Sequence, residues 1–100
     1  MSIVDIRKEV ELAIKTIVLN SYTRFIYFRA DKLKKANPQL RSVYTSHIGK
    51  IMNQVLHEYH GKGLIKILGI KRNHVTKFYV KVLKPYFDYA KKLVKEEAIA

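Results

Sequence analysis

The sequence contains no cysteine and no tryptophan, and its 100 residues include only eight aspartates and glutamates. The absence of cysteine excludes disulfide bonds and zinc sites built from thiolates. No apolar run reaches the roughly 18 residues of a membrane-spanning helix, and the amino terminus lacks the pattern of a secretory signal. We therefore expect a cytoplasmic protein that does not engage membranes.

Positive charge is abundant where acidic residues are scarce. Twenty lysines and arginines give the chain a formal net charge of +12 at pH 7. So many like charges raise the free energy of a compact fold unless an anionic partner relieves their repulsion. Nucleic acid fits this role best, because each phosphate neutralised by lysine or arginine releases condensed counterions. A nucleoid-associated location follows from this expectation.

The sequence lacks the residue patterns of catalytic and metal sites. Its scattered serines, histidines and aspartates include no nucleophile with a nearby base, no paired carboxylates and no metal triad. His57 and His60 have no third ligand at a known spacing, and Gly49-Lys50 lacks the upstream glycine of a phosphate-binding loop. We expect no enzymatic activity, metal, cofactor or small-molecule ligand.

Apolar periodicity predicts a first helix over about residues 3–20. Apolar residues recur at steps of three and four from Ile3 to Ile17, and Ser2 with Asp5 resembles a capping box. The chain as a whole is long enough for a single domain with a modest core.

Two short elements are predicted next. The aromatic and β-branched run from Phe25 to Phe28 has the length of an edge strand that pairs with a later one. A small helix follows over about 29–36, with Leu33 facing inward. Asn37-Pro38 ends it, because a residue before proline avoids the α conformation.

The longest predicted helix lies in the segment from Ser42 to Tyr59. Its expected bounds are about residues 43–59. Its apolar arc comprises Tyr44, Ile48, Ile51, Met52, Val55, Leu56 and Tyr59. Its opposite, polar arc comprises Ser46, His47, Lys50, Asn53, Gln54 and His57, with Glu58 at the margin. Gly61 and Gly63 end the helix, because its last turn closes best with a residue that tolerates positive φ. The polar arc carries the donors and acceptors that a DNA major groove requires.

A β-hairpin is predicted over about 64–82. Its strands are the alternating runs Leu64 to Leu68 and Thr76 to Val82, and the polar, basic segment 69–75 forms its tip. Within the second run, one side of the strand is apolar and consists of Phe78, Val80 and Val82.

This order of helix, short strand, short helix, long polar-faced helix and basic hairpin resembles the winged helix-turn-helix DNA-binding domain, of the small kind common in archaeal and archaeal-virus regulators. The resemblance covers about residues 5–82. It is carried by Phe25 to Leu33, Ser42 to Tyr59, Gly61 to Ile65 and Lys77 to Val82. It implies a mostly helical α+β fold with a recognition helix, a β-hairpin wing and an additional C-terminal helix. Arg29 stands where serine or threonine commonly caps the second helix.

The resemblance also implies which residues contact DNA. The polar arc would enter the major groove, where amides can bond adenine and lysine can reach guanine or phosphate, while the wing would meet phosphates or the minor groove. The recognition-helix contacts are Thr45, Ser46, His47, Lys50, Asn53 and Gln54. The wing and backbone contacts are Arg29, Lys32, Lys34, Lys35, Lys62, Lys71, Arg72 and Asn73.

A second apolar surface predicts a homodimer. Leu12 and Leu19 lie on a side of the first helix that a small domain would struggle to cover alone. A final helix over about 85–98, with Pro85 in its first turn, supplies another apolar stripe. The expected interface comprises Leu12, Leu19, Tyr86, Phe87, Ala90, Leu93 and Val94. Such a dimer would set two recognition helices about one DNA turn apart.

These expectations describe a regulator of transcription that binds double-stranded DNA sequence-specifically. Two alternatives remain open. One is an architectural protein of the same fold that coats DNA without sequence preference. The other is an RNA or protein-assembly module. Single-stranded RNA is disfavoured because Tyr27 and Tyr79 are the only evident outward aromatic residues for stacking.

Overall fold

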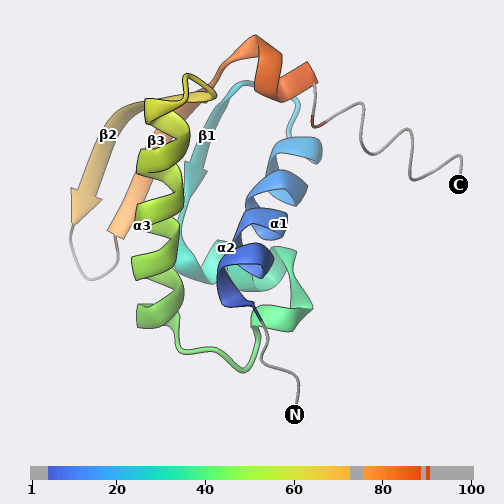
Figure 1. Ribbon diagram of the computed structural model, residues 1–100, viewed down its shortest axis with the longest axis vertical. Coiled ribbons are helices and arrows are strands. Elements are labelled where there is room, and N and C mark those ends of the chain that lie inside the picture. The colour runs from blue at the N-terminus through green and yellow to red at the C-terminus, as the bar shows by residue number, and fades with distance from the viewer. Residues whose placement is uncertain (1–4, 73–75, 89, 91–100) are drawn as a thin grey trace, which may run out of the picture.

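The computed structural model describes residues 5–72, 76–88 and 90. Its elements in chain order are α1 (Ile6–Leu19), β1 (Phe25–Phe28), α2 (Ala30–Ala36), the 3-10 helix η1 (Pro38–Leu40), α3 (Thr45–Gly61), β2 (Ile65–Arg72) and β3 (Thr76–Val82). Helices α1 and α3 lie side by side and cover one face of a three-stranded sheet (Figure 1). The predicted class, a mostly helical α+β domain, is confirmed.

Helix α1 begins later than its periodicity predicts. Asp5 has an extended backbone and is the N-cap, and its carboxylate accepts a hydrogen bond from the backbone amide of Lys8 at 3.2 Å. The helix therefore starts at Ile6 and not at Ile3, while the predicted capping residue Ser2 lies outside the described residues. The buried stripe of α1 comprises Val10, Ala13, Ile14, Ile17 and Val18.

The predicted edge strand and short helix are confirmed as β1 and α2. Asn37 ends α2 and is itself buried. Its side-chain amide donates to the carbonyl oxygen of Glu9 at 2.9 Å and to the Glu9 carboxylate at 2.7 Å, and its side-chain oxygen accepts from the Gln39 backbone amide at 3.1 Å. These bonds fix the end of α2 against α1. They also start η1, an element that the sequence analysis did not predict.

Helix α3 starts and ends about two residues later than predicted. The predicted apolar arc is buried or packed against the core for all its members except Tyr44, whose side chain is 83% exposed. Tyr44 is the N-cap with an extended backbone, so its side chain is not aligned with the helical stripe. The expectation that Tyr44 packs inward is wrong for this reason.

The predicted glycine stop is confirmed at Gly63, whereas Gly61 is the last residue of α3 itself. Gly63 has a φ of +75°, a conformation that glycine adopts without strain. The Gly63 amide donates to the carbonyl oxygen of His60 at 3.1 Å, and the Leu64 amide donates to that of Tyr59 at 3.0 Å. This pair of bonds is a Schellman motif, which satisfies carbonyl groups that the helix end would leave unpaired.

The sheet has the order β1-β3-β2 with both pairs antiparallel. The predicted hairpin tip, 69–75, is too long, because β2 continues to Arg72 and leaves 73–75 between the strands. A register shift between Ile67 and Gly69 explains the difference, since a bulge absorbs one extra residue and lets pairing continue.

The predicted inward side of β3 is buried in the core between the sheet and the helices. Beyond β3, residues 84–88 and 90 are helical and include Pro85 as predicted, and the remainder of the predicted helix to 98 lies outside the described residues. Tyr86 and Ala90 are buried in the same core, where the Tyr86 ring lies 5.6 Å from that of Tyr59.

Candidate nucleic-acid interface

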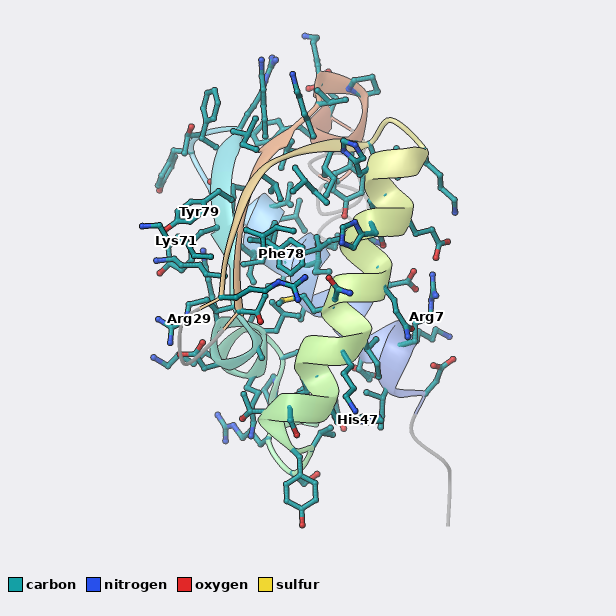
Figure 2. All side chains as sticks on the ribbon, turned by 90° about the vertical axis from the view of Figure 1, so that its left-hand side faces the viewer. Arg7, Arg29, His47, Lys71, Phe78 and Tyr79 are labelled. Atoms are coloured by element: carbon teal, nitrogen blue, oxygen red, sulfur yellow. The ribbon has the colours of Figure 1, made fainter. Side chains whose placement is uncertain are left out.

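The amino-terminal half of α3 forms an exposed polar ridge. Ile48 and Met52 are fully buried beneath it and fix its orientation on the domain. The side chains that make up this α3 ridge are Thr45, Ser46, His47, Lys50 and Gln54, all of them exposed. The prediction that the polar arc stays in solvent is confirmed for Ser46, His47, Lys50, Gln54 and His57, but not for Asn53, which is half-buried. Figure 2 shows His47 beside this end of the helix.

A groove borders the α3 ridge on each side. The first, which we name the wing groove, has a volume of about 410 Å³ and is lined by Ala30, Thr45, Ser46, Gly49, Lys50, Asn53, Arg72 and Thr76. The second has a volume of about 440 Å³ and is lined by Ile6, Ser42, Val43, Tyr44, Ser46, His47 and Lys50. Ser46 and Lys50 line both grooves. The ridge is therefore convex and accessible from both flanks.

Asn53 differs from the other predicted recognition residues because it is half-buried in the wing groove. Its side-chain oxygen is inaccessible to solvent and has no hydrogen-bond partner among the described residues. A buried, unpaired amide oxygen raises the free energy of the fold by about 1 to 3 kcal/mol. Asn53 is thus less available for direct base contact than Gln54, and its oxygen needs a donor within the groove.

Lys71 and Arg72 diverge, although the sequence analysis placed both at the tip of the wing. Both lie within β2, where successive side chains point to opposite faces of the sheet. Arg72 lines the wing groove beside α3. Figure 2 shows Lys71 and Tyr79 on the far side of the sheet, whereas Phe78 points toward α3. Asn73 lies outside the described residues.

The residues that were predicted to contact the DNA backbone lie in different parts of the structure. The Arg29 guanidinium lies 3.1 Å from the Asp31 carboxylate at the start of α2. Arg29 is the N-cap of α2, and its side chain makes no capping hydrogen bond. The Lys32 ammonium donates to the carbonyl oxygen of Tyr27 at 2.9 Å and is directed to the sheet. Lys34 is half-buried, and Lys35 is exposed.

Lys62 lies at the opposite end of α3 from the ridge. The 16 residues that separate it from Ser46 correspond to about 24 Å along the helix axis. Its ammonium is 3.1 Å from the Glu58 carboxylate. Lys62 therefore does not belong to the α3 ridge.

Acidic groups gather at this opposite end of the domain. Glu58 pairs with Arg7 of α1 as well as with Lys62, and these two cations, Arg7 foremost, lower the pKa of Glu58. The Tyr59 hydroxyl donates to the Glu11 carboxylate at 3.4 Å, and burial raises the pKa of Tyr59. The ridge itself carries no acidic side chain. None of the ion pairs among the described residues involves a residue of the ridge.

The predicted dimer residues are divided between the core and the surface. Tyr86 and Ala90 are buried within their own chain, so they are not free to form the surface of a partner contact in this arrangement. Phe87 and Leu19 are half-buried and pack against the core, whereas Leu12 is 48% exposed. Leu93 and Val94 lie outside the described residues. The dimer remains a prediction.

The sequence analysis did not identify Thr76, or the side of the sheet that faces away from the helices, as part of a candidate site. Thr76 enters the wing groove because it pairs with Arg72, a register that no local pattern specifies. The alternation that predicted the buried side of β3 also placed Lys77, Tyr79 and Lys81 on the other side. The sequence did not show that β1 would lie beside them.

Within residues 5–72, 76–88 and 90, no group of three or more histidine, cysteine or acidic side chains is placed to hold a metal ion. Over the same residues, no helix combines the length and apolar character required to cross a bilayer. Comparison with known proteins gives no match, since no family model fits the sequence and no curated protein or solved structure is significantly similar to the chain.

Proposed function

We propose that this protein binds double-stranded DNA, with the α3 ridge in the major groove and Arg72 at an adjacent phosphate or minor groove. The observation that carries the proposal is the ridge itself, a convex row of polar and basic side chains with a groove on each flank, and neither groove has an acidic residue in its described lining. A DNA major groove accepts a helix with this shape and charge.

The start of α3 suits phosphate contact. Tyr44 makes no side-chain capping bond, and the backbone amides of Thr45 and Ser46 have no acceptor within the described part of the chain. Free amides and the helix dipole both favour an anion at this end of a helix. Lys50 and Gln54, one and two turns further along, are then aligned with base edges.

The arrangement around α3 is consistent with a winged helix-turn-helix. Helix α2 precedes α3 and packs against it near Gly49, and the β2-β3 hairpin follows directly after the helix. In that arrangement the protein acts as a sequence-specific regulator of transcription, associated with the nucleoid. A homodimer that uses the exposed Leu12 would give it a pseudo-palindromic site.

Selection of bound oligonucleotides from a random duplex pool tests the proposal. We expect an enriched sequence, and a palindrome would in addition indicate a dimer. Gln54→Ala should relax base preference at one position, at a cost of about 1 to 3 kcal/mol. Arg72→Ala should weaken binding to all sequences and make its salt dependence shallower. Both variants should melt at the temperature of the unmodified protein.

Two results would count against this function. Duplex binding without any enriched sequence, and with equal losses in the two variants, would indicate an architectural protein that coats DNA by charge alone. No duplex binding at low salt would remove the proposal altogether.

A further inference from the structure

The side of the sheet that faces away from the helices is both aromatic and basic. The pairing register of the three strands places one set of side chains on it, which we name the outer sheet face. Its members are Phe25 and Tyr27 of β1, Lys77, Tyr79 and Lys81 of β3, and Lys66 and Lys71 of β2. Phe25 is 60% exposed and Tyr27 is 41% exposed. In Figures 1 and 2, none of the helices of the described residues covers this face.

Strand register brings the aromatic rings together. Tyr27 lies directly opposite Tyr79, and Phe25 lies opposite Lys81. Side chains in such directly opposed positions are neighbours across the strands. Three rings contributed by segments some 50 residues apart therefore occupy one continuous surface, which the sequence analysis did not anticipate.

Three lysines of this face, Lys71, Lys77 and Lys81, lie close to aromatic rings, and so does Lys32 of the adjoining helix α2. The Lys32 and Lys77 ammonium groups lie 3.8 and 4.2 Å from the Tyr27 ring centre, and Lys77 also lies 5.4 Å from that of Tyr79. Lys81 lies 5.7 Å from the Phe25 ring centre. Strands β1, β2 and β3 contain no acidic residue. These cations are close together without a counterion among the described residues.

The pKa of Lys32 is lowered from its ordinary value. Partial burial lowers it first, and the positive charge of Lys77 lowers it further. An anion placed over the face would remove part of this repulsion. The electrostatics of the surface therefore favour a ligand with several negative charges.

We propose that the outer sheet face binds single-stranded nucleic acid, whose bases stack on Phe25, Tyr27 and Tyr79 and whose phosphates pair with the surrounding lysines. Unpaired bases expose flat aromatic faces, and stacking on side-chain rings with cationic groups alongside is a common way to bind them. Ammonium groups that now rest on the rings would move to phosphates as bases take their places. This site lies on the opposite side of the sheet from the α3 ridge.

Other occupants fit the face less well. In a duplex the bases already stack on one another, so the rings would gain no partner. A second copy of the chain would bring like charges together, because every member with a charge is a lysine. An anionic bilayer would attract the lysines, but Tyr79 is half-buried between them and does not project as a membrane anchor would.

The test compares three variants in titrations of a labelled single strand of about 12 thymidines, a length within the usual range for one such surface. Tyr79→Leu removes the ring, Tyr79→Phe keeps it, and Tyr22→Leu removes a fully exposed tyrosine outside the strands. We expect Tyr79→Leu to weaken binding at least about fivefold, the lower limit for one lost base stack. Tyr79→Phe and Tyr22→Leu should bind as the unmodified protein does. Tyrosine fluorescence, which tryptophan does not obscure here, should fall on binding.

Parallel titrations with an RNA strand of matching length, a random duplex and phosphatidylserine vesicles complete the design. The RNA titration tells which type of single strand is preferred. Duplex affinity should not depend on Tyr79, and single-strand affinity should not depend on Gln54. If the unmodified protein binds the single strand but not the duplex, the proposed function is refuted and this inference stands.

Three outcomes would overturn the inference. One is single-strand binding that Tyr79→Leu does not change, or no single-strand binding at all. Another is an equal effect of Tyr79→Leu on single strand and duplex, which would indicate one undivided cationic surface. The third is Tyr79-dependent binding of the vesicles without binding of oligonucleotides. Circular dichroism melting of each variant ensures that a loss of binding is not a loss of fold.

Discussion

The two halves of α3 differ in how their charges are used. In the amino-terminal half, Lys50 is exposed and forms none of the ion pairs among the described residues. In the carboxyl-terminal half, Glu58 pairs with Arg7 and Lys62, and the His57 ring packs edge-on against Phe78 at 5.8 Å. One helix and its C-cap thus present one lysine without an ion pair among the described residues, Lys50, and one that is paired with a carboxylate, Lys62.

The difference shows that residue type alone does not identify a binding cation. Lys50 and Lys62 belong to the same helix, and both were predicted to contact DNA. When a cation pairs with a carboxylate, the local positive potential is lowered. An unpaired cation in a chain of high net charge keeps its attraction for phosphate. Ion pairing within the fold separates the cations that support α3 from those that are free to bind.

The largest expected effect concerns the buried side of α3, which extends through both halves of the helix. Met52 is fully buried in the middle of the helix. Met52→Ala should lower the free energy of unfolding by about 2 to 5 kcal/mol, because it removes apolar contacts and leaves a cavity. Chemical denaturation measures this, with exposed Gln54→Ala as the control, for which a change within about 0.5 kcal/mol is expected. Equal effects of the two changes would mean that the helix is wrongly oriented.

The carboxyl-terminal end of α3 offers the next largest effect. Gly63 has positive φ and open space around its Cα, so an alanine there is strained by backbone conformation and not by a clash. Gly63→Ala should destabilise the protein by about 1 to 2 kcal/mol. Thermal unfolding monitored by circular dichroism provides the measurement. An unchanged melting temperature would show that the helix does not end in this conformation.

Paired substitutions at Lys50 and Lys62 test the comparison directly. Lys50→Gln should weaken duplex binding about five- to tenfold at 0.1 M salt and reduce the salt slope by about one, since one phosphate contact is lost. Lys62→Gln should change affinity by less than about twofold, because Glu58 already neutralises that charge. Fluorescence anisotropy over a salt series measures both. Equal losses would erase the distinction between the two halves.

A smaller, stabilising effect is expected in the amino-terminal half. A Cβ atom at Gly49 would lie 4.0 Å from the Cβ of Ala30, which is an ordinary contact distance. Gly49→Ala should therefore raise the free energy of unfolding by up to about 1 kcal/mol, as alanine favours the helix interior. A urea titration would detect the gain. A loss of stability would instead show that α2 and α3 need the closer approach that glycine permits.

The smallest effect concerns the pH dependence of the Glu58 pairs. Because the folded pKa of Glu58 is lowered, its contribution to stability is complete above its ordinary value of 4.5 and disappears as the pH falls through the folded pKa. The unmodified protein should therefore lose more stability on acidification than Glu58→Gln does. Urea unfolding between neutral and acidic pH makes the comparison. Parallel losses in both proteins would show that these exposed pairs contribute nothing.

Local patterns predicted much of the fold. The buried stripe of α3, the glycine stop after it and the inward side of β3 all follow from periodicity or from backbone conformational preferences. The start of α3 and the end of β2 were predicted wrongly for local reasons that the spacing of apolar residues does not reveal. Tyr44 falls on the apolar spacing but precedes the helix, and the bulge near Gly69 lengthens β2 by several residues.

The candidate site could be predicted only in part. The exposed row on α3 followed from helical geometry. The opposite directions of Lys71 and Arg72 did not, because the sequence analysis treated them as loop residues and a loop has no faces. The half-buried position of Asn53 depends on Arg72 and Thr76, which reach the wing groove only when the hairpin folds back beside α3.

By itself, the sequence determined that the protein is strongly basic, which main helices and strands it forms and most of the residues on the apolar side of each, because these properties depend on composition and on spacing within a few residues. The tertiary structure decided which cations have carboxylate partners and which stay free. It also decided that Tyr27 and Tyr79 meet on one surface. Both outcomes depend on strand register and helix packing between segments that are distant along the chain, and local periodicity carries no information about either.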